Sequence, residues 1–343
     1  MFKTGLVSIV IPFHNAENYA LRCLKCLNNQ IYKNYEAIFI DDGSTDKTAY
    51  IIKEYLNEKI KLISISKSGV STARNVGINQ AQGEYITFWD IDDVPHNDLL
   101  ATFIEDVRKN HVETVISNYE NVFADQKRIK VNLPWTNRII NSDEIDGVLI
   151  PRMICAFSNE EPIRGLVWRS FTRTELLKKN KISFNPNISL AEDLLFTIEL
   201  YKVSKKIYIE TKSIYDYMQN RTSTINKYNN KYLENNIMLH EYLINLLKKL
   251  SIYEINKERC YVNKLKIYSF CISNCVRNPN IKLSVLSEMK NIRSLLLKDK
   301  INIFHSLAPT KVKIACCLLR LKMYWLLIGI YMVKEKWRTS KYN

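Results

Sequence analysis

The first 117 residues alternate between short apolar runs and segments with helical periodicity, and this alternation constrains the fold more than any other feature. The runs LVSIVIP, YEAIFIDD, IKLISIS, EYITFWD and ETVIS have the length of strands and are mostly Ile, Val, Leu and Phe. Such strands are typical of a parallel sheet covered by helices on both faces. The segments between them predict those helices. We therefore expect an α/β fold with a parallel or mixed sheet and flanking helices.

Two of the apolar runs end in clusters of aspartates. YEAIFIDD ends in Asp41 and Asp42, and EYITFWDIDD carries Asp90, Asp92 and Asp93. Parallel sheets bind ligands beyond the carboxyl ends of their strands, so both clusters are expected at one rim. In an extended strand end, Asp90 and Asp92 would point to the same side and offer hard oxygen ligands to Mg²⁺ or Mn²⁺. Helix capping by Asp92 or Asp93 is the alternative interpretation.

The chain carries 50 lysines and arginines against 35 aspartates and glutamates, a formal net charge of +15. This excess indicates an anionic partner: a nucleotide, a nucleic acid or a negatively charged membrane surface. The eight cysteines are irregularly spaced, which favours reduced thiols in a cytosolic protein. Cys23 and Cys26 are three residues apart, but no second pair completes a zinc site.

The motifs VSIVIPFHN, IDDGSTD, GVSTARNVGINQAQGEYITFWDIDD and AEDLLF resemble glycosyltransferase family 2 in their order and spacing, over residues 6 to about 225. The resemblance implies a GT-A fold. Residues 1–117 would form its nucleotide-sugar-binding half and residues 118–225 its acceptor-binding half. Four prolines interrupt the second region, and residues 226–343 form a lysine-rich region with helical patterning. This last region predicts a helical C-terminal module.

The resemblance also implies an activity. A hexose or N-acetylhexosamine would pass from a nucleotide-sugar, with a UDP-sugar favoured, to a hydroxyl of a glycan acceptor, with inversion at the sugar carbon. The chain lacks the Gln-x-x-Arg-Trp element of processive members, which favours transfer of a single sugar. The pathway indicated is synthesis of a bacterial capsule, O-antigen or other surface polysaccharide.

Donor contacts are assigned by the same resemblance. Pro12 and the following loop would lie against the nucleotide, with His14 where the family more often has Tyr. Asp42, assisted by Asp41, matches the position that binds the base. Arg74 in the ARN sequence matches a basic residue near the donor nucleotide.

The same resemblance assigns metal binding to Asp90 and Asp92, and catalysis to Glu192 and Asp193. Asp90 matches the first acid of the Asp-x-Asp element, and Asp92 the acid that reaches Mn²⁺ or Mg²⁺. A divalent cation there would offset the charge that accumulates on the leaving diphosphate. Asp193 matches the general base that the acceptor hydroxyl requires, and Glu192 would orient the acceptor or the base. The alternative is that the pair only complements the dipole of the helix it begins.

Five further residues are assigned to the acceptor half. Arg221 would contact the pyrophosphate or an anionic acceptor, with Ser223 nearby. Arg164, Trp168 and Arg169 in IRGLVWRSF are expected to line the acceptor cleft, although Trp168 would equally suit the core.

Residues 311–341 form a basic, apolar tail. Its ten Leu, Ile and Val between 312 and 333 contribute roughly −3 to −6 kcal/mol to membrane insertion, and two central basic residues cost roughly +5 to +7 kcal/mol, so a spanning helix is disfavoured. An in-plane anchor on anionic lipid fits better. Arg320 and Lys322 lie on opposite sides of a single helix, which predicts two short helices meeting near residue 321. The charged residues of the tail are Lys311, Lys313, Arg320, Lys322, Lys334, Lys336, Arg338, Lys341 and Glu335.

This interpretation predicts a peripheral protein at the inner face of the cytoplasmic membrane, with a lipid-linked glycan as acceptor. Packing of the tail on the catalytic domain, or in a homodimer, remains open. Other functions are a nucleic-acid-binding protein, a catalytically silent GT-A scaffold, or a nucleotidyltransferase. The sequence lacks an RNP-like strand or zinc pattern for the first, and a Gly-rich basic loop after the first strand for the last.

Overall fold

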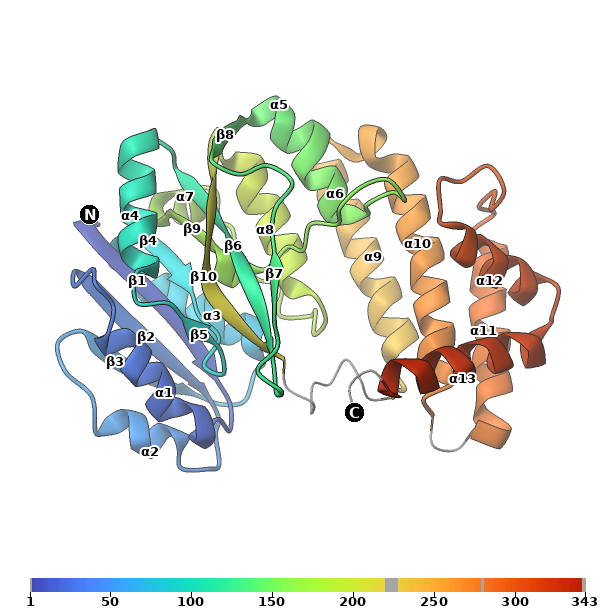
Figure 1. Ribbon diagram of the computed structural model, residues 1–343, viewed down its shortest axis with the longest axis horizontal. Coiled ribbons are helices and arrows are strands. Elements are labelled where there is room, and N and C mark those ends of the chain that lie inside the picture. The colour runs from blue at the N-terminus through green and yellow to red at the C-terminus, as the bar shows by residue number, and fades with distance from the viewer. Residues whose placement is uncertain (1, 220–227, 279–280, 341–343) are drawn as a thin grey trace. The chain divides into compact units, whose positions relative to one another are not determined.

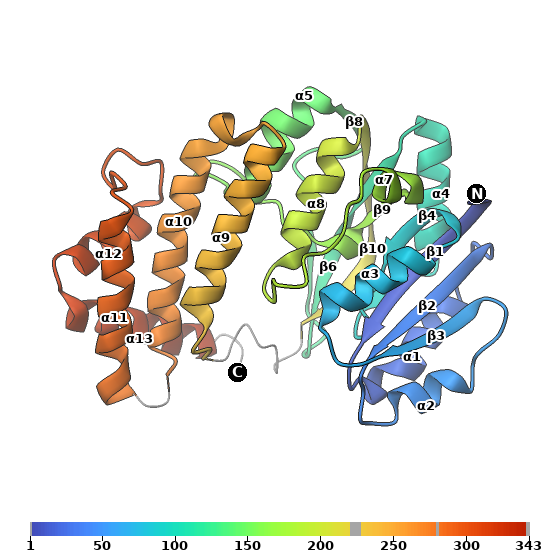
Figure 2. The same cartoon turned by 180° about the vertical axis from the view of Figure 1, so that it is seen from behind.

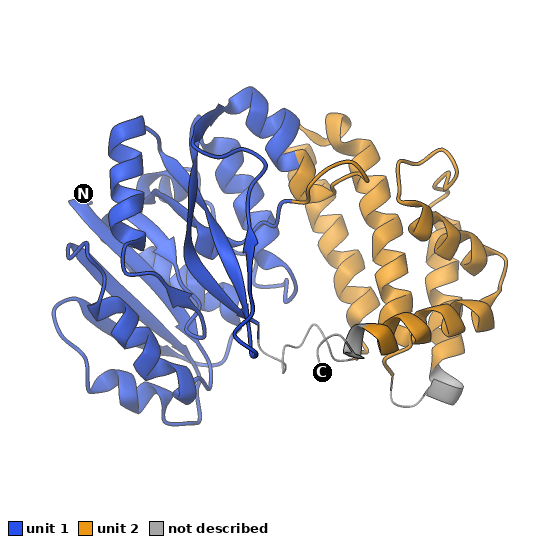
Figure 3. Cartoon of the chain, in the orientation of Figure 1, with its two compact units in different colours: residues 1–150, 163–221 blue, residues 151–162, 222–343 orange. Residues whose placement is uncertain are grey.

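The computed structural model describes residues 2–219, 228–278 and 281–340. The chain divides into two compact units (Figure 3). The first comprises residues 1–150 and 163–221, and the second residues 151–162 and 222–343. The first unit is an α/β unit, and the second consists mainly of helices.

A ten-stranded mixed sheet forms the centre of the first unit (Figure 1). Its main path runs β3-β2-β1-β4-β9-β6-β10-β5, with β7 paired to β6 and β8 to β10. Strands β1 to β4 are mutually parallel, β9 runs antiparallel to both β4 and β6, and β10 is parallel to β6. The predicted α/β fold with a mixed sheet is therefore confirmed. The strands are β1 (Lys3–Phe13), β2 (Tyr35–Asp42), β3 (Ile60–Ile65), β4 (Gly83–Phe88), β5 (Val94–Pro95), β6 (Thr114–Phe123), β7 (Arg128–Val131), β8 (Arg138–Asn141), β9 (Ser170–Arg173) and β10 (Lys206–Gln219).

Helices cover both faces of the sheet, as Figures 1 and 2 show. Val7, Ile9 and Ile11 of β1 point to one face and share a buried core with α1 and α4. On the other face α3 packs directly on β1, where a Cβ added to Gly77 would lie 2.2 Å from Val10 Cγ1. Only glycine allows this approach of helix to strand. The helices of this part of the chain are α1 (Glu17–Asn28), α2 (Thr48–Lys53), α3 (Val70–Gln80), α4 (Leu99–Asn110), α5 (Ser142–Glu144), α6 (Ile150–Ile154), α7 (Thr174–Lys179) and α8 (Glu192–Val203).

The described residues of the second unit form five longer helices: α9 (Tyr232–Lys249), α10 (Tyr253–Cys275), α11 (Ile281–Lys298), α12 (Thr310–Arg320) and α13 (Tyr324–Ser340). Helix α12 ends at Arg320 and α13 starts at Tyr324, so the predicted break near residue 321 is confirmed. Lys322, between the two helices, has a left-handed backbone with φ 60°. All eight cysteines are free thiols, and seven of them are buried.

Candidate active site

Asp90, Asp92 and Asp93 lie in a turn that follows β4, not in an extended strand end. The strand ends at Phe88, and the backbone N–H of Asp93 donates to the carbonyl of Asp90 at 3.1 Å. The predicted alternation of residues 90 and 92 is therefore wrong, because the chain has already turned. Asp93 is 1% exposed and accepts from the Met218 N–H at 2.9 Å. Burial, together with the charges of Asp90 and Asp92, raises its pKa well above the usual range.

Arg74 on α3 is a buried cation, 3% exposed, that joins the two acidic motifs. Its Nη2 lies 3.1 Å from Asp90 Oδ1, and its Nη1 lies 2.8 Å from Glu192 Oε1 and 2.6 Å from Asp193 Oδ1. The guanidinium group also lies over the ring of Phe184, 5.1 Å from its centroid. Acids from distant parts of the sequence thus surround one arginine, at the carboxyl end of β4.

The first turn of α8 carries Glu192 and Asp193, and the residue before it has an unusual backbone. Ala191 is left-handed, with φ 55°. This conformation costs a residue with a Cβ about 1 kcal/mol or more, so surrounding contacts impose it. The chain that leads to this residue is attached to α3 by Asn75, next to Arg74: its side-chain amide bonds both the N–H and the carbonyl of Phe184 at 2.8 Å.

The carboxylate of Asp193 is held at both oxygens. Oδ1 accepts from Arg74, and Oδ2 accepts from the backbone N–H of Val167 at 3.4 Å. Burial raises the pKa of Asp193 to about 7; Arg74 acts to lower it, whereas Glu192 and Asp90 raise it further. A carboxyl group with a pKa near neutrality suits general acid–base chemistry.

Asp41 and Asp42 are buried at the carboxyl end of β2. Asp42 accepts the N–H of Ser68 at 2.6 Å through Oδ1 and that of Gly69 at 2.9 Å through Oδ2. Asp41 accepts the N–H of Ser44 at 2.8 Å. Each carboxylate oxygen has two lone pairs, so a further N–H or hydroxyl can still be accepted at this rim.

His14, in the loop after β1, has contacts that define which of its ring nitrogens donates. Its Nδ1 lies 3.0 Å from the carbonyl oxygen of Asp42, and its Nε2 lies 2.7 Å from Lys67 Nζ. A carbonyl can only accept, so Nδ1 carries the hydrogen and Nε2 accepts from the ammonium group. Pro12 is buried at the end of β1 and pairs with Ile40.

Of the residues predicted to line the acceptor cleft, Trp168 and Arg169 are buried, whereas Arg164 is exposed. Trp168 is 1% exposed and stacks on Tyr215, with ring centroids 4.4 Å apart. Arg169 is 2% exposed, and its guanidinium donates twice to the carbonyl of Ser117, at 2.9 and 2.6 Å. Both residues belong to the core, so their assignment to the surface of a cleft is corrected. Arg164 is exposed.

The remaining two predicted residues, Arg221 and Ser223, lie outside the residues that the structure describes.

Three residues near these acids were not singled out by the sequence. Asn75 belongs to the ARN motif, and its position next to Arg74 is the sequence feature that could have pointed to it. Lys67 precedes a glycine-containing loop, and nothing in the sequence connected it to His14. The Tyr215 hydroxyl accepts the N–H of Asp90 at 3.1 Å and bonds the Asp93 carboxyl, so Tyr215 of β10 helps to hold the turn.

Asp90 and Asp92 could hold a divalent cation only together with other ligands. Within the described ranges no three His, Cys, Asp or Glu side chains are grouped as a metal cage. Mg²⁺ sites of phosphate-transferring enzymes commonly use one or two carboxylates, with substrate phosphates and water completing the shell. The hard oxygen donors of Asp90 and Asp92 fit that chemistry.

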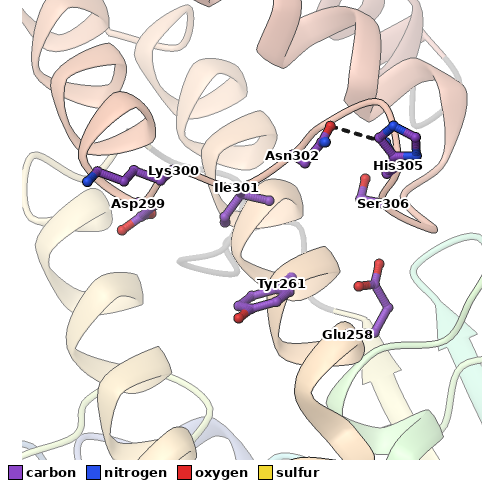
Figure 4. Close-up of a pocket in the computed structure, with 8 residues that line it drawn as sticks. All are labelled: Glu258, Tyr261, Asp299, Lys300, Ile301, Asn302, His305 and Ser306. Carbon is purple, nitrogen blue, oxygen red and sulfur yellow. Dashed lines mark hydrogen bonds between the residues drawn. The ribbon is translucent and has the colours of Figure 1, made fainter.

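A separate pocket lies in the helical unit (Figure 4). It encloses about 230 Å³. Its acids are already engaged: Asp299 accepts from Lys264 at 2.9 Å and from Tyr268, and Glu258 accepts the Leu307 N–H at 2.9 Å. No residue of the acidic motifs lines it, so the candidate active site lies in the first unit. The lining residues are Glu258, Tyr261, Asp299, Lys300, Ile301, Asn302, His305 and Ser306.

The fold is that of a GT-A-type protein. The chain is similar, over 96% of its length and 91% of that chain, to Staphylococcus aureus TarS 1–349 solved in complex with UDP-GlcNAc, with a TM-score of 0.67 and 19% identity. Residues 8–159 match the family model described as Glycosyl transferase family 2.

The chain is also similar in sequence to two known proteins. The uncharacterised glycosyltransferase EpsJ of Bacillus subtilis is 27% identical over 220 residues, covering 64% of this chain and 62% of the relative. The cholesterol galactosyltransferase of Borreliella burgdorferi is 29% identical over 216 residues, covering 62% and 60%. The chain thus spans about three-fifths of the length of these relatives. Residues 8–159, the part that the family model covers, belong to glycosyltransferase family 2.

Along the described residues, no helix combines the length and the apolar character that crossing a bilayer requires.

Proposed function

We propose that the protein is a metal-dependent, inverting glycosyltransferase that moves one hexose or N-acetylhexosamine from a UDP-sugar to a hydroxyl of a lipid-linked glycan. The observation that carries this proposal is the arrangement around Arg74. It brings Asp90, at the end of a parallel strand, next to Glu192 and Asp193 at the start of a helix. A donor-side acid and a candidate base therefore face one another across a single buried cation.

The donor nucleoside would bind at the ends of β1 and β2. Asp41 and Asp42 offer acceptor oxygens for a nucleobase N–H or a ribose hydroxyl. His14 and Lys67 add a polar, cationic group beside them. That the similar TarS structure was solved with UDP-GlcNAc supports uridine as the first base to test.

The transfer itself needs a base on the acceptor side. An acceptor hydroxyl is a poor nucleophile at neutral pH, and Asp193, with its pKa of about 7, can take its proton as the bond to the sugar forms. A single displacement of the nucleoside diphosphate then inverts the anomeric centre. A divalent cation bound with Asp90 and Asp92 would offset the negative charge on the leaving diphosphate.

The tail supports a membrane-bound acceptor. Helix α13 buries Leu327, Ile328 and Tyr331, and Glu335 on this side pairs with Arg277 at 3.0 Å. Its opposite side is exposed and largely apolar, and Lys334 and Lys336 are exposed on the same helix. An in-plane helix on anionic lipid has this composition. The exposed large side chains of α13 are Trp325, Leu326, Ile330, Met332, Val333 and Trp337.

Calorimetry tests the donor site. UDP, dTDP and GDP are titrated with and without Mn²⁺ into the wild-type chain and into Asp92→Ala. We expect Mn²⁺-dependent binding of one nucleotide, which the variant loses. If no nucleotide binds under either condition, the donor site is refuted and a silent GT-A scaffold is favoured.

A further inference from the structure

Arg74 matches a residue expected near the donor nucleotide, but its surroundings give it a different task. Its side chain is 4% exposed, and three carboxylates occupy its terminal nitrogens. Nη1 donates to both acids of α8, and Nη2 donates to Asp90. Its Nε has no hydrogen-bond partner but is buried, so a diphosphate has little access to a guanidinium that already faces three carboxylates.

The contacts also fix where the guanidinium lies. The ring of Phe184 supports one face of Arg74. That ring stacks on Phe196 of α8, with centroids 4.0 Å apart and planes inclined by 4°. The backbone of Phe184 is in turn bonded to Asn75, the neighbour of Arg74. The cation is therefore held between α3 and α8 by packing as well as by charge.

We propose that Arg74 is a positioning residue that sets the place of Asp193 relative to the donor-side acid Asp90. The inference rests on the proposed function, because it takes Asp193 as the base. A guanidinium presents its donors in a rigid, planar fork, so three acids bound to it keep fixed directions. It acts on the reaction through those acids and does not bind the donor.

A lysine at this position separates charge from geometry. Arg74→Lys keeps the positive charge, but a single ammonium lacks the fork that reaches both Asp90 and the α8 acids. Misplacement of a catalytic group by about 1 Å costs on the order of 100-fold in rate. We therefore expect Arg74→Lys to lower turnover about 100-fold, while the Kd of the nucleotide stays within about threefold.

Arg259 provides a matched control in the helical unit. It is also a largely buried arginine paired with a carboxylate, at 2.6 and 2.8 Å from Glu160, and it lies over the ring of Phe157 at 4.1 Å. Arg259→Lys thus measures what the loss of a buried, ring-supported guanidinium does to the fold alone. Its turnover should stay within about threefold of wild type, because it contacts none of the site acids.

The experiment measures nucleotide affinity by calorimetry with UDP, dTDP and GDP. It measures turnover as release of nucleoside diphosphate from sugar conjugates of whichever nucleotide binds, with water as the acceptor of the sugar. Phe184→Leu is the second variant should Arg74→Lys fail to fold. It leaves the ion pairs but removes the supporting ring, and we expect turnover to fall about three- to tenfold with unchanged affinity.

Five results would overturn the inference. Arg74→Lys, or Phe184→Leu in its place, could retain wild-type turnover. Arg74→Lys could lose nucleotide affinity tenfold with unchanged turnover of bound donor, which would make Arg74 a donor ligand. Arg74→Lys and Arg259→Lys could lose turnover equally, which would make the role purely structural. If the wild type binds a nucleotide but shows no turnover, Asp193 has no role as a base and the inference fails with it. If the wild type binds no nucleotide, the proposed donor site itself is refuted.

Discussion

The side-chain amide of Asn75 and the backbone of Phe184 form two hydrogen bonds, both 2.8 Å long. They attach the segment before α8 to α3, although the two residues are 109 positions apart in the sequence. The left-handed residue Ala191 and the acids of α8 come later in the same segment. The ARN motif therefore uses both its polar residues: Arg74 binds the acids, and Asn75 holds the chain that leads to them.

We expect Asn75→Ala to lower the free energy of unfolding by about 1–3 kcal/mol, because two backbone groups lose their partner. Urea unfolding of the full chain measures this change. Asn180→Ala is the control, since the Asn180 amide bonds only the carbonyl of Leu176 in its own helix and is exposed. Equal losses in the two variants would contradict the anchoring role.

Asp193→Asn tests the base against the helix-dipole alternative. The amide keeps the shape of the side chain but cannot take a proton, so turnover should fall by about 100- to 10,000-fold with little change in nucleotide affinity. Release of nucleoside diphosphate and calorimetry measure the two quantities. Glu175→Gln is the control, because Glu175 is likewise an acid in the first turn of a helix. If both variants change only stability, by less than about 1 kcal/mol, the pair merely complements the dipole.

The sequence predicts the parallel half of the sheet well because its strands are apolar on both faces and its helices are amphipathic. It does not predict the turn at Asp90, because alternation describes a strand only as far as the strand continues. The sequence assigns Asp90 and Asp92 to the metal and leaves Asp93 as a possible helix cap. The structure instead buries Asp93, which accepts from the N–H of Met218.

Long-range contacts explain the other differences. Trp168 and Arg169 are an aromatic and a charged residue side by side, a pattern that suits a cleft as well as a core. Their partners Ser117 and Tyr215 come from strands that no local pattern pairs with them. The break near residue 321 was predictable, because two basic residues on opposite sides of one helix cannot both avoid an apolar surface.

A second buried acid, Asp106 on α4, predicts a pH dependence of stability. Burial raises its pKa to about 8, with a hydrogen bond and charge from Glu210 adding to the effect. The native state thus keeps a proton that the unfolded chain loses near pH 4. Its contribution to stability is greatest below pH 4 and is lost as the pH rises to about 8, with a slope of at most about 1.4 kcal/mol per pH unit.

Asp106→Asn removes this titration while keeping a hydrogen-bond donor for Glu210. The variant should gain stability relative to wild type as the pH is raised from 5 to 8.5, measured by urea unfolding at both values. Glu241→Gln, an exposed acid on α9, should show no such gain. A difference between wild type and Asp106→Asn that is independent of pH would contradict a proton shared with Glu210.

The tail prediction is best tested by substitution, because α12 buries Val312, Ala315, Cys316 and Leu319 in the helical unit. Deleting residues 311–343 would expose that core, so loss of membrane binding could reflect unfolding. Trp325 and Val333 are 68% and 71% exposed on α13, and serine at both positions leaves the buried side intact.

We expect the double variant Trp325→Ser, Val333→Ser to bind vesicles of phosphatidylglycerol and phosphatidylcholine at least tenfold more weakly than wild type. Each large apolar group is worth about 1.5–3 kcal/mol when it leaves water, and about 1.4 kcal/mol is a factor of ten. Flotation measures binding, and pure phosphatidylcholine vesicles with added salt separate the charge from the apolar contribution. Ile31→Ser, which removes a 64% exposed side chain of the first unit, should leave binding unchanged. Two results would show that α13 is not a lipid anchor: equal vesicle binding by the double variant and wild type, or no binding of wild type to anionic vesicles. The apolar side of α13 would then have to be covered by another protein surface.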